Sequence, residues 1–157
     1  MADAKGAVGH IKLRGLGCVS ASFRQVIGGV VAPRLQTDQP LDFAMQLRIH
    51  AVSDNGVTAE VRLVLTHNHE TGQPYDAEVT YRGDFELGDL PEGLTPQSFA
   101  ERNAPAIIFP YLRETLTSLT GRGAPGPVFI PPVNVTALIE GAKSRGSRRS
   151  SSRVATG

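Results

Sequence analysis

Cysteine, tryptophan and long apolar runs are scarce or absent in this chain of 157 residues. Cys18 is the single cysteine, so no disulfide can form within the chain and one chain cannot assemble a thiolate zinc site. No apolar stretch approaches the roughly 18 residues that a membrane helix needs, and residues 1–6 lack the apolar stretch of a secretory signal. We therefore expect a cytoplasmic protein that does not insert into membranes.

Sequence signals of catalysis are also missing. His67 and His69 could supply two imidazole ligands, but no further ligand stands at a spacing typical of a zinc site. Nothing places a histidine beside Cys18, and the glycine-rich segments at 15–17 and 121–123 lack the spacing of a phosphate loop. We predict that the protein is not an enzyme and has no cofactor and no metal site.

Charge is divided unevenly along the chain. The net charge is +1, and residues 141–157 contain five cationic residues and no acid, which leaves a net charge of −4 for residues 1–140. The cationic residues are Lys143, Arg145, Arg148, Arg149 and Arg153. Because this segment has almost nothing apolar to bury, we predict a disordered basic Ser/Arg tail at 141–157, a folded domain at 9–140 and a flexible N-terminus at 1–8.

Hydrophobic periodicity predicts four strands between residues 9 and 87. One strand covers 9–24, with a register that depends on whether its glycines introduce a bulge. Residues 41–87 alternate apolar and polar side chains in three runs, separated by turns at 54–56 and 70–74, which predicts an antiparallel meander. Residues 25–40 form an unusually apolar connection that we interpret as a crossover.

Helical periodicity follows the strands. Thr95 before a proline predicts a helix start, and the apolar residues between 107 and 119 form one broad helix face. Pro105 and Pro110 are expected to kink this long helix, and Asn134 to cap a short last helix that ends near residue 140. The segment 128–130 between the two helices has the appearance of a buried apolar loop. The predicted fold is α+β: a four-stranded antiparallel sheet followed by a kinked long helix and a short C-terminal helix.

The most distinctive motif spans residues 103–134. It consists of Phe109-Pro110-Tyr111, then Arg113-Glu114, then Arg122-Gly123, and finally a proline-containing loop with Pro132-Val133-Asn134 at the start of the last helix. This series closely resembles the SecB family of export chaperones, and the resemblance covers roughly residues 9–140. It implies an ATP-independent holdase that forms a homotetramer, binds unfolded precursor proteins and delivers them to the SecA motor of the Sec translocase.

The resemblance also implies roles for individual residues. Apolar side chains of the crossover and of the last helix would contact unfolded clients: Val26, Ile27, Val30, Val31, Leu35, Val135, Leu138 and Ile139. Two acidic residues of the last strand, Asp76 and Glu78, would dock the motor. The long-helix motif would serve oligomer contacts through Phe109, Pro110, Tyr111, Arg113 and Glu114.

Two departures from the family pattern keep alternatives open. The first strand lacks the acidic residues expected there, and the C-terminal segment is basic where that of the family is usually acidic. A SecB-like chaperone dedicated to a toxin–antitoxin system, with an antitoxin as its partner, is therefore the alternative function. A third reading is a nucleic-acid-associated protein that uses the basic tail. Because no aromatic side chain is interleaved with the cations, no nucleic-acid partner is expected.

Overall fold

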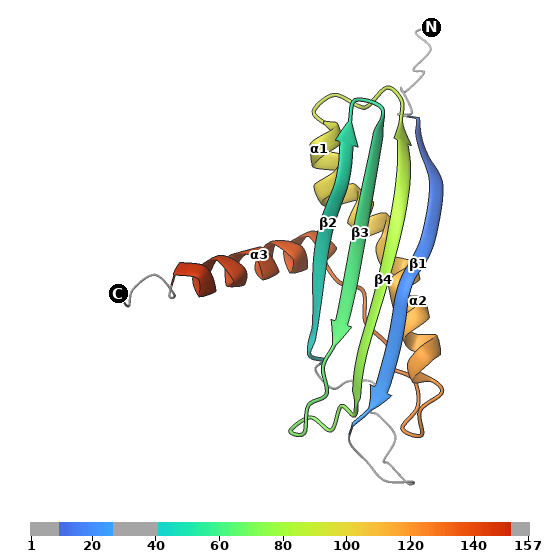
Figure 1. The fold of residues 1–157 in the computed structure, drawn as a ribbon, viewed down its shortest axis with the longest axis vertical. Helices are drawn as coiled ribbons and strands as arrows, with labels where there is room; N and C mark the ends of the chain where they lie inside the picture. Colours follow the sequence, from blue (N-terminus) through green and yellow to red (C-terminus); the bar gives the residue numbers. More distant parts are fainter. Residues whose placement is uncertain (1–9, 27–40, 152–157) are drawn as a thin grey trace, which may run out of the picture.

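The computed structural model describes residues 10–26 and 41–151, with side chains through Ser144. Its centre is an antiparallel sheet of four strands, β1 (Ile11–Gln25), β2 (Phe43–Ser53), β3 (Gly56–Leu65) and β4 (Tyr75–Leu87), in the order β1-β4-β3-β2 (Figure 1). The strands β1 and β2 therefore lie at opposite edges of the sheet. The predicted crossover between them falls largely on residues 27–40, outside the described residues.

The predicted three-strand meander is confirmed. Ser53 pairs with Gly56 across the β2–β3 turn, as the Asp-Asn-Gly sequence at 54–56 predicts. In β3 every second side chain, from Val57 to Leu65, is buried against the helices, while the residues between them remain partly accessible. This alternation follows from the pleat of a strand that has one covered and one open face.

Strand β1 is irregular. Its register against β4 shifts between Leu13 and Gly15 and again between Cys18 and Ser20. Each shift inserts an extra residue, so a single alternating phase cannot describe the whole strand. Val19 lies at the second shift and is 57% exposed.

One face of the sheet is covered by a helical segment in three parts. Helix α1 (Pro96–Ser98) leads into a π-helical stretch, η1 (Phe99–Asn103), and then into α2 (Ala104–Thr120), all behind the sheet in Figure 1. The predicted start at Thr95 is confirmed, since its side chain accepts a hydrogen bond from the backbone N–H of Ser98 in a capping box. The departure from α-helical geometry lies at η1, which precedes both Pro105 and Pro110. Pro105 occupies the first turn of α2, where a missing N–H costs little, and Pro110 lies inside the helix.

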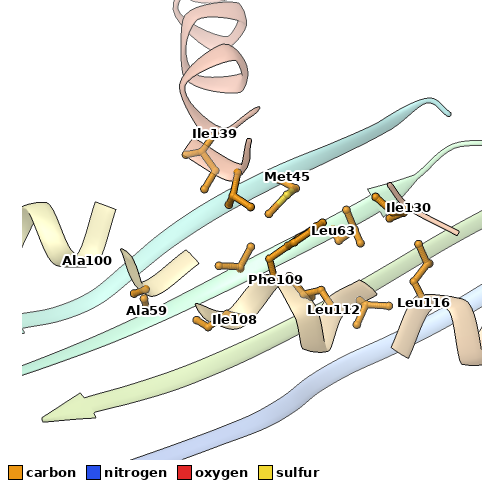
Figure 2. Close-up of a cluster of buried hydrophobic side chains, with 14 of the residues drawn as sticks. Met45, Ala59, Leu63, Ala100, Ile108, Phe109, Leu112, Leu116, Ile130 and Ile139 are labelled. Atoms are coloured by element: carbon orange, nitrogen blue, oxygen red, sulfur yellow. The ribbon is translucent and has the colours of Figure 1, made fainter. Parts of the chain in front are cut away.

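The core lies between α2 and the sheet. Ile108, Leu112 and Leu116 recur every four residues on α2 and are fully buried, packed with Met45 and Leu63 of the strands (Figure 2). The broad apolar helix face expected from the sequence is thus divided. One half fills the core, and the other half, which includes Ile107 and Tyr111, faces outward.

The turn after α2 explains the Arg-Gly pair of the motif. A Cβ atom added to Gly123 would collide with the ring and hydroxyl of Tyr75, whose hydroxyl donates a 2.9 Å hydrogen bond to the Gly126 carbonyl. Tyr75 is fully buried at the start of β4. A residue with a side chain at position 123 would therefore displace the loop from the sheet.

The last helix, α3 (Val135–Ser151), begins as predicted. The Asn134 side chain accepts a 3.0 Å hydrogen bond from the backbone N–H of Ala137. The helix continues beyond residue 140, however, and projects away from the sheet (Figure 1). Residues 141–151 are thus helical where the sequence predicts a disordered tail, and extending a helix that is already nucleated adds a hydrogen bond for each residue ordered. Residues 1–9 and 152–157, which complete the two predicted termini, lie outside the described residues.

Candidate functional site

The outward face of α2 carries apolar side chains that the sheet does not cover. Ile107 is 37% exposed and Tyr111 is 39% exposed. Toward the end of the helix this face continues into a groove of about 520 Å³, which we call the α2 groove. Its lining residues are Pro110, Arg113, Glu114, Thr117, Ser118, Phe129 and Ile130. The surface is large enough to bind an apolar segment of another chain.

The five residues predicted for oligomer contacts have different environments. Phe109 is buried, and the guanidinium carbon of Arg113 lies 5.9 Å from the centre of its ring. Pro110, Tyr111 and Glu114 are exposed. Phe109 is therefore a core residue that positions Arg113, and only the other four can reach a partner directly.

Tyr111 packs against Tyr81 of strand β4. Its ring centre lies 6.2 Å from that of Tyr81, and the Tyr81 hydroxyl is 2.7 Å from the Thr115 hydroxyl. The aromatic pair joins the outward face of α2 to β4, so that contact with Tyr81 orients a side chain that is still 39% exposed.

The predicted client-contacting residues are only partly exposed. Val26 is 40% exposed at the end of β1, where its backbone N–H donates a 2.7 Å hydrogen bond to Pro74. Leu138 is half-buried, whereas Val135 and Ile139 are buried in the core. The last two side chains anchor α3 in the core, and their contact with a client stays a prediction. Ile27, Val30, Val31 and Leu35 lie outside the described residues.

Phe129 is an apolar surface residue that the sequence reasoning missed. It is 58% exposed, while its neighbours Val128 and Ile130 are almost fully buried. The segment was expected to be buried as a whole. Its extended backbone places alternate side chains on opposite sides, and this period of two, applied to the loop, would have identified Phe129.

The two predicted docking residues lie on the open face of the sheet, opposite the helices. Asp76 accepts hydrogen bonds from the backbone N–H of His67 at 2.9 Å and from Arg24 at 3.0 Å, and its other contact is the His67 Nδ1 at 2.7 Å. The hydrogen bonds from His67, the backbone one first, and the one from Arg24 lower the pKa of Asp76 to about 2. Asp76 therefore stays charged at neutral pH and is already engaged by its own chain.

Glu78 is engaged in the same way. It accepts a 2.5 Å hydrogen bond from Arg62, and this contact lowers the pKa of Glu78 and raises the pKa of Arg62. Arg14 and Glu86 form a further ion pair on this face. The open face thus carries several ion pairs, and the charges of the two predicted docking acids are partly neutralised by residues of the same chain.

Neither a metal-binding cluster nor a membrane-spanning helix occurs in residues 10–26 and 41–151. There, no three histidine, cysteine or acidic side chains lie close enough together to hold a metal ion. Likewise, no helix there is both long enough and apolar enough to cross a bilayer.

These features together define a class: an α+β binding protein with one polar sheet face and an exposed apolar groove on its long helix. The family model described as preprotein translocase subunit SecB matches residues 22–145. The chain therefore belongs to the SecB family.

Relatives support this membership over most of the chain. A protein-export protein SecB from Acidithiobacillus ferrooxidans is 32% identical over 71% of this chain and 76% of its own length. One from Hyphomonas neptunium is 27% identical over 74% of this chain and 71% of its own length. Among solved structures, the Mycobacterium tuberculosis Rv1957 SecB-like chaperone, in complex with a ChAD peptide from the HigA1 antitoxin, superposes with a TM-score of 0.58. It has 14% identity and covers 78% of this chain and 87% of that one, which supports the predicted fold.

Proposed function

We propose that this protein is an ATP-independent holdase that binds unfolded precursor proteins in the cytoplasm and delivers them to the Sec translocase. The observation that carries the proposal is the exposed α2 groove with Phe129 at its rim, in a chain of the SecB family. Folded clients hide their apolar segments, so such a groove binds unfolded chains selectively. Binding then lowers the concentration of free unfolded client by mass action, and this step needs no nucleotide.

Client contact in this proposal combines Phe129 with two of the residues expected from the family. Val26 is accessible at the root of the crossover, and Leu138 is partly accessible on α3. The predicted crossover residues 27, 30, 31 and 35 would complete the surface. Aromatic and aliphatic side chains suit this role because they bind apolar segments without requiring one sequence.

Self-association is the second part of the proposal. β1 is a long edge strand, and Ile107 and Tyr111 form an apolar patch on the outer side of α2. Edge strands and apolar patches both favour pairing with another copy, so we propose a homotetramer that uses the β1 edge and the patch of Ile107 and Tyr111.

Aggregation of an unfolded client, followed by light scattering without ATP, tests the holdase proposal. The wild-type protein should slow aggregation, and Phe129→Asp and the double variant Val26→Asp/Leu138→Asp should weaken this effect. Val52→Asp is the matched control, since Val52 is an exposed valine of β2 that lies apart from the groove, the outer patch of α2 and the β1 edge. Equal loss in the control, or full activity of both the Phe129 variant and the double variant, would contradict the proposed client surface.

Two partners are proposed, the SecA motor for export and an antitoxin for a dedicated chaperone. For export we propose that Asp76 and Glu78 contact a basic segment of SecA. The pairing of both acids with Arg24, His67 and Arg62 favours the alternative, a chaperone dedicated to a toxin–antitoxin system, because a basic segment must compete with these internal partners.

Titration of SecA against the full-length protein distinguishes the two partners. Export predicts binding that weakens with added salt and with Glu78→Arg, chiefly through the association rate. If SecA does not bind the wild-type protein at low salt, the dedicated chaperone becomes the better account, and co-purification of an antitoxin is then the expected result.

A further inference from the structure

The outer part of α3 is an ordered arm that the chaperone function does not use. Val135 and Ile139 are buried and attach the first turns of the helix to the body, where α3 contacts β2 and α2. In Figure 2 Ile139 points toward the same cluster as Met45. Beyond residue 140 the helix leaves the body and runs away from the sheet (Figure 1). The arm, which we define as residues 141–151, is therefore held in one direction by its base.

The arm is strongly basic. It contains Lys143, Arg145, Arg148 and Arg149 and no acid. Residues 145 and 149 are one helical turn apart and residue 148 lies between them, so the helical period places these three positions on one side. The arm thus concentrates positive charge in a helical segment whose own sequence contains no acid.

Three possible occupants are disfavoured by the composition of the arm. Ala142 is its only apolar side chain besides glycine, so the arm has no apolar face to insert into a membrane surface. For the same reason it has no aliphatic or aromatic anchor of the kind that fills a pocket on a partner protein. The third possible occupant is the acidic surface of the body itself, but its acids Asp76 and Glu78 are already paired with Arg24, His67 and Arg62.

We propose that the arm binds the phosphate backbone of double-helical nucleic acid without sequence preference. Arginine predominates over lysine, and a guanidinium can form two parallel hydrogen bonds with one phosphate. The serines between the arginines supply hydroxyl donors of the type that contact phosphates. A duplex fits better than a single strand, because the arm has no aromatic side chain on which unpaired bases could stack. The helix is already formed, so less conformational entropy is lost on binding than for a disordered tail.

This inference does not depend on the holdase proposal, and it predicts a specific salt dependence. Each phosphate neutralised on a duplex contributes about −0.9 to the slope of log K against log salt, so the four cations of the arm give a slope of up to about −3.6. The dissociation constant at physiological salt should fall in the non-specific range of about 10⁻⁴ to 10⁻⁶ M.

Fluorescence anisotropy with the full-length protein and a labelled 20-base-pair duplex, about two helical turns, tests the inference. The triple variant Arg145→Ser/Arg148→Ser/Arg149→Ser should bind at least about tenfold more weakly at low salt, with a slope smaller by about 3. The matched control is Arg48→Ser/Arg82→Ser/Arg102→Ser, which removes the same charge from exposed positions of the body. Circular dichroism verifies that both variants are folded.

Other ligands in the same assay identify the class of molecule that binds. Duplex DNA and duplex RNA should both bind, and a single-stranded RNA of the same length should bind more weakly. The inference is overturned if the wild-type protein does not bind either duplex at low salt, or if the control loses as much affinity as the arm variant. It is also overturned if a poly-glutamate peptide or anionic vesicles bind the arm more tightly than the duplexes do.

Discussion

The two faces of the sheet are made from the same strands and serve opposite purposes. On the covered face, Val61 and Leu63 are fully buried beneath α2. On the open face, Arg62 stands between these residues in the chain and pairs with Glu78 across to β4. Burial stabilises the fold through area removed from water, whereas exposed ion pairs contribute little stability but determine which charges a partner meets. Changes on the first face should therefore alter folding, and changes on the second should alter recognition.

The largest expected effect is on the covered face. Leu112→Ala removes a fully buried side chain and should lower the free energy of unfolding by about 2 to 5 kcal/mol through lost burial and the cavity left behind. Urea denaturation followed by circular dichroism measures it. Val19→Ala on the other side of the sheet is the control and should change stability by less than about 0.5 kcal/mol. Similar losses of stability in Leu112→Ala and Val19→Ala would contradict the conclusion that the covered face supports folding more than the open face does.

Self-association should be the next most sensitive property. Tyr111→Asp places a charge in the apolar patch of α2 and should weaken assembly at least tenfold, about 1.4 kcal/mol, while leaving secondary structure intact. Light scattering at micromolar concentration should then give a lower mass than the wild-type protein. A monomer mass for the wild-type protein would contradict the proposed tetramer itself.

On the open face, Asp76→Asn should have a smaller effect that depends on pH. Because the folded pKa of Asp76 is about 2, below its unfolded value, its contribution is present above about pH 4 and is lost as pH falls toward 2. The variant should be less stable by about 1 kcal/mol at neutral pH, since the carboxylate is partly solvated and its ion pair is screened. The difference between the two unfolding curves should shrink as pH approaches 2 and vanish below the folded pKa. A difference that persists there would assign the effect to packing.

Glu78→Gln should produce the smallest change in stability. Its ion pair with Arg62 is more than a third exposed on both sides, so unfolding should shift by only a few tenths of a kcal/mol. The same substitution should reduce the association rate of a basic partner measured by stopped-flow mixing, and the reduction should disappear in high salt. A large loss of stability with an unchanged association rate would show that Glu78 stabilises the fold and does not contact the partner.

Local patterns were the reliable part of the sequence reasoning. The turn at 54–56, the caps at Thr95 and Asn134 and the alternation of β3 each depend on neighbouring residues, and the structure confirms them. The bulges of β1 were left open because glycine permits a bulge without requiring one. The exposure of Phe129 and the length of α3 were missed, since the first depends on what lies beneath the loop and the second on helix growth from an anchored base.

The sequence by itself determined the fold class, the order of the elements and, through the motif at 103–134, the family. These properties are encoded in local spacing, because strand and helix periods and capping residues act within a few positions. Only the tertiary structure decided that Val135 and Ile139 belong to the core and that Asp76 and Glu78 are already paired. Burial and ion pairing join residues that are distant in the chain, and the side-chain period alone does not show which of two apolar or charged positions will meet a partner.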